Sequence, residues 1–138
     1  MKTLILFYSY SGNTRRIAQN KAEEIGADIE EISEVKKPSV LAAFTIGCYK
    51  AIRGLQSPIK PLKSRLSDYE CIIIMSPIWA HHPVPAVYTA ISRLPAGRKV
   101  ELVMVSASSG SQNSAKKTMA LVEARGCEVV AYTDLKAK

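Results

Sequence analysis

The chain contains short runs of apolar residues that predict strands buried on both faces. Residues 4–8 (LILFY) and 71–75 (CIIIM) carry no charge, and residues 100–105 carry only Glu101. Continuous apolar runs of this length are typical of interior strands in a parallel sheet that is covered by helices on both sides. These three segments are therefore expected to form the middle of one sheet.

Two other segments mix apolar and acidic residues. Residues 28–32 place Ile29 and Ile32 among three acidic residues, and residues 128–132 begin with Glu128. A strand whose side chains meet water belongs at the border of a sheet. Both segments are therefore predicted to be edge strands.

Apolar residues spaced three or four apart predict a helix after each of the first four strands. Gly26, Gly54 and Gly126 stand where three of these helices would end, and Pro95 follows the other one. The residues that carry the spacing are Ala18, Ala22 and Ile25; Leu41, Phe44, Cys48, Ile52 and Leu55; Val87, Ala90, Ile91 and Leu94; and Ala115, Met119 and Val122.

Strand and helix thus alternate along the chain, which predicts an α/β fold with one domain over residues 1–138. With the charged strands at the edges, the expected sheet is five-stranded and parallel, in the order 2-1-3-4-5, with helices on both faces. In such a sheet ligands bind outside the carboxyl ends of the strands, where the strand order reverses. The turns after strands one and three flank that point.

The turn after the first strand is rich in hydroxyl groups and opens a helix. The first N–H groups of a helix have no partner within it, and the helix dipole adds partial positive charge there. The G-x-x-x-x-G-K-[ST] and G-x-G-x-x-G patterns are absent. Neutral donors of this kind suit a phosphate monoester, although a polar turn that merely caps a helix is an alternative. The turn consists of Ser9, Tyr10, Ser11, Gly12, Asn13 and Thr14.

This turn resembles the [ST]-x-[ST]-G-x-T phosphate loop of flavodoxins and flavodoxin-like proteins, which also follows the first strand. The resemblance implies a flavodoxin-like three-layer sandwich and FMN as the cofactor. It also implies that the turns after strands three and four contact the flavin ring. The cofactor-binding residues are then Ser9, Tyr10, Ser11, Gly12, Asn13 and Thr14; Pro77, Ile78, Trp79 and Ala80; and Ser106, Ala107, Ser108, Ser109 and Gly110.

Trp79, the only tryptophan, lies in residues 76–83, which are expected to form a loop after strand three. A flat indole next to a phosphate site can stack on a ring system, whereas a tryptophan that fills a surface cleft is the alternative. The adjacent His81 and His82 could carry protons near neutral pH, whereas a pair that is simply exposed and solvated is the alternative. No catalytic residue and no metal ligand is assigned, since the chemistry would be that of the flavin.

The net charge is +7, and neither residues 76–85 nor residues 106–114 contain an Asp or Glu. A positive surrounding should stabilise a reduced, negative flavin, which favours two-electron transfer. The predicted function is that of an FMN-binding redox protein, either an electron carrier or an NAD(P)H-dependent quinone or flavin oxidoreductase. The alternative is a basic binding module that uses the same crevice for another phosphorylated ligand or an acidic partner. A hydrolase is disfavoured because G-x-S-x-G is absent.

The expected partners are a redox partner protein, or NAD(P)H with a quinone-like acceptor. No nucleic-acid motif accompanies the basic residues, and no apolar run is long enough to span a membrane. Cys48, Cys71 and Cys127 are widely separated and are expected to be reduced. A cytoplasmic location is predicted because no secretion signal is recognised at the start. The sequence leaves the choice between monomer and homodimer open.

Overall fold

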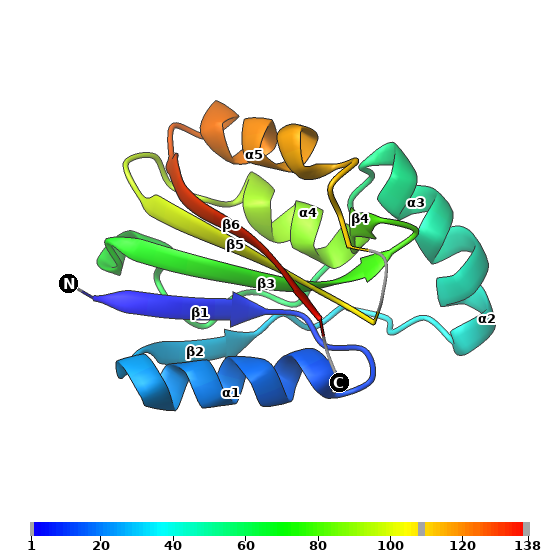
Figure 1. Ribbon diagram of the computed structural model, residues 1–138, viewed down its shortest axis with the longest axis horizontal. Helices are drawn as coiled ribbons and strands as arrows, with labels where there is room; N and C mark the ends of the chain where they lie inside the picture. Colours follow the sequence, from blue (N-terminus) through cyan, green and yellow to red (C-terminus); the bar gives the residue numbers. More distant parts are fainter. Residues whose placement is uncertain (1, 108–109, 137–138) are drawn as a thin grey trace.

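A computed structural model, which describes residues 2–107 and 110–136, contains a twisted sheet with helices on both faces (Figure 1). Five of its strands are mutually parallel and lie in the order β2-β1-β3-β5-β6. The predicted order 2-1-3-4-5 is therefore confirmed, with the two charged segments at the edges. These strands are β1 (Thr3–Phe7), β2 (Asp28–Glu31), β3 (Cys71–Trp79), β5 (Lys99–Ser106) and β6 (Glu128–Lys136).

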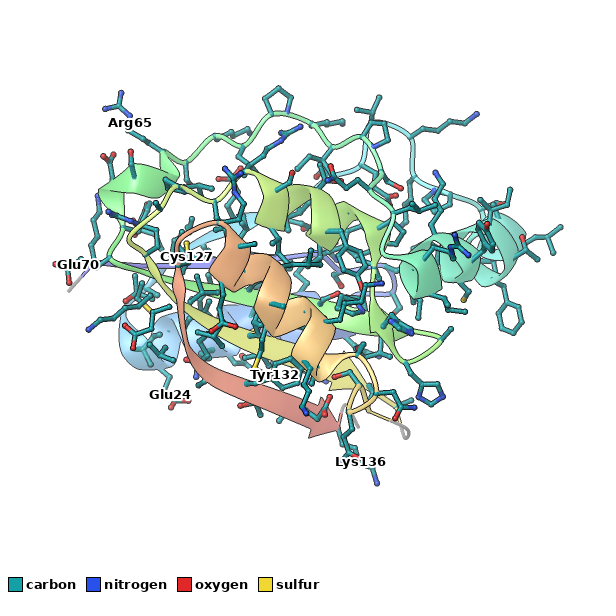
Figure 2. All side chains as sticks on the ribbon, turned by 90° about the horizontal axis from the view of Figure 1, so that it is seen from above. Glu24, Arg65, Glu70, Cys127, Tyr132 and Lys136 are labelled. Atoms are coloured by element: carbon teal, nitrogen blue, oxygen red, sulfur yellow. The ribbon has the colours of Figure 1, made fainter. Side chains whose placement is uncertain are left out.

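The helices divide the core into two clusters. Helix α1 (Asn13–Ile25) packs Ala18 and Ala22 against one face of the sheet. Helices α4 (Pro85–Ser92) and α5 (Ala115–Ala124) cover the other face, where the larger cluster lies. Figure 2, seen from above, shows α5 crossing this face beside Tyr132 of β6. The 3-10 turn η2 (Leu66–Asp68) adds Leu66 to the same cluster.

Strand β3 is longer than the sequence predicts, because residues 76–79 continue the strand and do not form a loop. It pairs with β5 as far as Pro77↔Val105 and then turns back into β4 (His82–Pro83), a short antiparallel sixth strand. The carbonyl oxygen of Met75 accepts a hydrogen bond from the N–H of Tyr8. The backbone of Pro77, two residues later, therefore faces the same side of β3, at a level where β1 has already ended. No neighbouring strand needs an N–H there, which explains why proline is tolerated.

The predicted helix after β2 exists, but its orientation was not predictable from its spacing. It consists of α2 (Val40–Ala42), a π-helical turn η1 (Ala43–Gly47) and α3 (Cys48–Arg53), and it ends at Gly54 with φ 68°. Its inner side carries only the small residues Ala43, Gly47 and Ala51. The apolar residues that revealed the helix point mostly outward: Leu41, Phe44, Ile52 and Leu55 are exposed, and Cys48 is half-buried.

Candidate functional site

A cleft of about 340 Å³ lies at the carboxyl ends of the parallel strands. Three segments line it: the turn after β1, the end of β3 and the end of β5, as expected at the reversal of strand order. All of the described lining residues are uncharged. They are Tyr10, Ser11, Asn13, Thr14, Pro77, Ile78, Trp79, Val105, Ser106 and Ala107.

The turn after β1 is shaped so that the start of α1 remains open toward the cleft. Gly12 adopts φ 106°, a left-handed conformation that favours glycine, and its N–H donates to Ser9 Oγ at 3.0 Å. Among the described residues no side chain caps α1. Because the first-turn amides are not used within the helix, they can donate to the oxygens of an anion. Thr14, which is 2% exposed, adds a hydroxyl group at the same place.

The opposite wall is Trp79, which two tyrosines hold in place. Its ring centroid lies 5.7 Å from that of Tyr10 and 6.1 Å from that of Tyr8, both in edge-to-face geometry. The β3–β4 hairpin fixes the backbone, since Trp79 pairs with His82 across a two-residue turn. On the helix side, a Cβ atom built on Gly47 would lie 2.8 Å from the Cζ3 atom of the indole. The indole is therefore wedged between the cleft and the η1 turn.

A positive charge lies next to the turn after β1, and sequence reasoning did not predict it. The Nζ atom of Lys37 is 3.1 Å from the carbonyl oxygen of Tyr10 and 4.7 Å from the centroid of its ring. The Tyr10 hydroxyl donates to the carbonyl oxygen of Pro38 at 2.9 Å. The basic connection after β2 thus packs on the turn that follows β1. Only the density of lysine in that connection hinted at this contact.

The third segment of the cleft, at the end of β5, is followed by residues that hydrogen bonds to a carboxylate hold in place. Gly110 donates its N–H to Ser106 Oγ at 3.2 Å, and Ser111 donates both its N–H and its hydroxyl to Asp134. Asp134 comes from β6, a strand that was predicted to end at residue 132, so the sequence did not place an acidic residue here. Ser108 and Ser109, which were predicted to bind the cofactor, lie outside the described residues.

His81 and His82 lie beside the cleft but do not line it. The Nδ1 atom of His81 is 3.3 Å from the carbonyl oxygen of Gly110, so the exposed hairpin turn touches the third segment. The Nδ1 atom of His82 is buried and has no hydrogen-bond partner among the described residues. Burial lowers the pKa of His82, and the positive charge of Lys117 lowers it further. His82 is therefore neutral near pH 7 and cannot contribute a charge to an anion.

Nine of the fifteen predicted binding residues line the cleft. Of the others that the structure describes, Ser9 and Gly12 shape the turn after β1, Ala80 lies in the hairpin turn with φ 52°, and Gly110 donates a hydrogen bond to Ser106. Val105 was missed because it belongs to an apolar strand, where the sequence gives no reason to distinguish it from its buried neighbours.

A second hollow of about 280 Å³ lies on the helix side of Trp79, and that residue alone lines both spaces. Glu34 lies in its wall and accepts a hydrogen bond from the Tyr8 hydroxyl. Burial raises the pKa of Glu34, while the Tyr8 hydrogen bond and the charges of Lys50 and Lys37 act in the opposite direction. Burial also raises the pKa of Tyr8, which keeps its hydroxyl protonated as the donor.

A search of protein families matches residues 1–133 of the chain to the model described as NADPH-dependent FMN reductase. The match spans the turn after β1, both other segments of the cleft, strands β1 to β5, and β6 as far as Thr133. A search of curated proteins found no significant match.

Solved structures share the fold at low sequence identity. A flavoprotein from Lactobacillus acidophilus NCFM, crystallised in complex with FMN, has a TM-score of 0.81 and 22% identity, with 96% of this chain and 92% of that chain covered. The two-electron reduced flavodoxin of Megasphaera elsdenii has a TM-score of 0.59 and 16% identity, with 96% and 85% covered. A flavodoxin from Streptococcus pneumoniae TIGR4 has a TM-score of 0.55 and 15% identity, with 100% and 88% covered.

Proposed function

Since this chain belongs to the NADPH-dependent FMN reductase family, we propose that it holds FMN in the strand-end cleft and passes electrons in pairs from NADPH to a small acceptor such as a quinone. FMN is the cofactor of this flavodoxin-like redox family. It supplies the redox chemistry, while the protein supplies position, exclusion of water and an electric field. We further propose that residues 1–138 act as one domain.

The residues of the cleft fit this cofactor. The phosphate would lie at the start of α1, where Ser11, Asn13 and Thr14 surround amides that the helix itself does not use. The φ of 106° at Gly12 lets the backbone come close to phosphate oxygens. Trp79 would contact the ring system, and the segment from Ser106 to Gly110 would donate N–H groups to its polar edge.

The electrostatics of the cleft favour a two-electron reaction. Negative charge that develops in the cleft on reduction meets no carboxylate among the described lining residues, and Lys37 lies beside the phosphate turn. The chain as a whole carries +7. Asp134 is the nearby exception, but it already accepts two hydrogen bonds from Ser111. The uncharged cleft of about 340 Å³ that three strand ends build is the observation that carries the proposal.

The first experiment measures NADPH oxidation by the FMN-loaded protein with a soluble quinone as the acceptor. We expect NADPH to be consumed one for one with the quinone, and a redox titration in which two electrons enter in one step. A protein that binds FMN but oxidises neither NADPH nor NADH, and that a separate reductase can reduce, would be an electron carrier. A protein that remains colourless in excess FMN would contradict the cofactor site itself.

Two variants test the proposed contacts. Trp79→Ala should weaken FMN binding, because it removes the apolar wall, while Tyr49→Ala on the exposed side of α3 serves as the control. His82→Gln tests the proton role that the sequence suggested for the histidine pair. Because His82 is neutral and does not line the cleft, we expect the pH profile of the quinone reaction to remain unchanged. A shifted profile would return this histidine to the mechanism.

A further inference from the structure

The α2–α3 segment presents its large apolar residues to the outside. Seven of them are between 45% and 79% exposed, and we call them the outer face: Val40, Leu41, Phe44, Ile46, Tyr49, Ile52 and Leu55. A surface helix normally does the reverse, with its apolar side on the core and its polar side in water. Contiguous apolar patches of this kind mark sites of interaction.

The segment cannot roll to hide these residues, because its inner side is in close contact with the body. Gly47 lies against the indole of Trp79 so tightly that even a Cβ atom would stand 2.8 Å from a ring carbon. Ala51 is fully buried on the same side. A rotation that brought Phe44 or Ile46 inward would place a large side chain where glycine alone fits. The exposure of the outer face is therefore a fixed property of the fold.

The charge around this face is mainly positive, and Glu34, which accepts a hydrogen bond from Tyr8, is the acidic residue in the wall of the neighbouring hollow. Between residues 35 and 67 the chain has seven Lys or Arg residues and no Asp or Glu. Lys36 lies in the wall of the hollow that Ile46 also lines, and Arg53 at the end of α3 is exposed. Two copies that met through this face would bring these positive charges together, which is unfavourable. The charge pattern instead complements an anionic surface.

We propose that the outer face docks on an anionic lipid bilayer, with its apolar side chains among the acyl chains and its basic residues at the headgroups. From Val40 to Leu55 the segment is about 24 Å long, and Figures 1 and 2 show it projecting from one end of the molecule. A bilayer can accommodate a projecting helix without a preformed groove. Phe44 and Tyr49 are aromatic, as is common at membrane interfaces.

The contact would be peripheral. Within the described residues, no helix is long and apolar enough to cross a membrane. Apolar insertion and attraction to anionic headgroups add to each other in such helices, and each basic residue near the surface contributes about 1 kcal/mol, or roughly fivefold in binding. Docking depends only on the α2–α3 segment and its charges, so it is independent of the proposed redox function.

The experiment measures co-sedimentation of the intact protein with vesicles of phosphatidylcholine, with and without phosphatidylglycerol. At low ionic strength we expect binding to the anionic vesicles to be at least about tenfold stronger, and added salt to reduce this preference. Phe44→Ser with Ile52→Ser should lower binding about a hundredfold, since each inserted side chain contributes on the order of tenfold. Lys36→Gln with Arg53→Gln should remove most of the anionic preference.

The matched control is Ile25→Ser with Val130→Ser. Both residues are 46% exposed, close to the 49% of Ile52, but they lie on α1 and β6. We expect this control to bind vesicles as the unchanged protein does. All the substituted side chains are exposed, and circular dichroism would confirm that the variants fold.

Three results would overturn the proposal. One is an absence of binding to anionic vesicles, and another is a control pair that loses as much binding as the outer-face pair. The third is a dimer in lipid-free solution, seen by light scattering, that Phe44→Ser with Ile52→Ser dissociates, because the face would then bind a second copy. Binding to poly-glutamate but not to anionic vesicles would instead indicate an acidic protein partner.

Discussion

Helices α1 and α2–α3 have similar inner sides and opposite outer sides. Helix α1 buries Thr14, Ala18 and Ala22, and α2–α3 buries Ala43, Gly47 and Ala51, so small residues bring both close to the body. The outer side of α1 is polar apart from Ile25, whereas the outer side of α2–α3 is almost wholly apolar. The inner side of a helix therefore indicates how the helix packs on the rest of the protein, and the outer side indicates what else the helix contacts.

The largest expected effect is at the inner side of α1, where Thr14 is both buried and part of the proposed cofactor site. Thr14→Val keeps the shape of the buried side chain but removes its hydroxyl, and a hydrogen bond to a charged group contributes about 1.5–3 kcal/mol. We therefore expect FMN to bind about 10- to 100-fold more weakly, as measured by equilibrium dialysis. Asn20→Ala, on an exposed position of α1, is the control. If the two variants bind FMN with equal affinity, α1 is not part of the cofactor site.

The inner side of α2–α3 should be almost as sensitive. Alanine favours a helix over glycine by about 1 kcal/mol, so propensity alone predicts that Gly47→Ala is stabilising. The contact with Trp79 predicts the opposite: overpacking costs about 1–3 kcal/mol in the free energy of unfolding, measured with urea.

A double-mutant cycle identifies the source of that cost. In a Trp79→Leu background the clash is removed, so Gly47→Ala should lose its destabilising effect there. If the cost is the same in both backgrounds, the indole is not what holds α2–α3 with its apolar side outward.

A smaller effect is expected on the outer side of α1. Arg15 pairs with Glu31 through two hydrogen bonds, at 2.9 Å and 2.7 Å, but both side chains are at least one-third exposed. Exposed pairs contribute about 0.2–1 kcal/mol, so Arg15→Gln should lower the free energy of unfolding by no more than that, and less in high salt. Arg16→Gln, at an exposed neighbour, is the control. A larger loss of unfolding free energy would mean that polar side chains on the outer side of a helix also stabilise the fold.

The smallest effect concerns Glu34, beside the hollow under α2–α3. Burial raises its pKa above the ordinary value of 4.5, so the folded state binds the proton more tightly than the unfolded state does. Its contribution to stability is therefore present below pH 4.5 and is lost as the pH rises through the folded pKa. Glu34→Gln should flatten this part of the curve of unfolding free energy against pH. A curve that instead rises more steeply in the unchanged protein would mean that Lys50 and Lys37 outweigh burial.

The sequence predicted most of the sheet, because buried strands and charged edge strands leave different patterns. It also brought the turn at Gly12 and Trp79 to one cleft. It did not predict the β3–β4 hairpin, since Pro77 suggested the end of a strand. Only the structure reveals that β1 ends earlier than β3, so that no N–H donor is needed at position 77. It could not place Asp134 or Lys37 near the cleft, because those contacts join distant parts of the chain.

The spacing of the outer-face residues predicted a helix correctly and gave no indication of which way it faces. Periodicity records only that apolar side chains share one side of a helix. It does not tell whether that side meets the core of the same chain. Here the small residues at positions 43, 47 and 51 pack against the rest of the protein. In the sequence, a glycine in the middle of the predicted helix was the sign that this side faces inward.

Trp79 is the chain's only fluorophore of its kind, and it forms a wall shared by the cleft and the hollow under α2–α3. A flavin bound on one side would quench its emission, whereas a displacement of the η1 turn on the other would shift the wavelength of that emission. The two events would therefore be separable in one spectrum without any attached dye. Trp79 is therefore an intrinsic fluorescent reporter for both the cleft and the hollow.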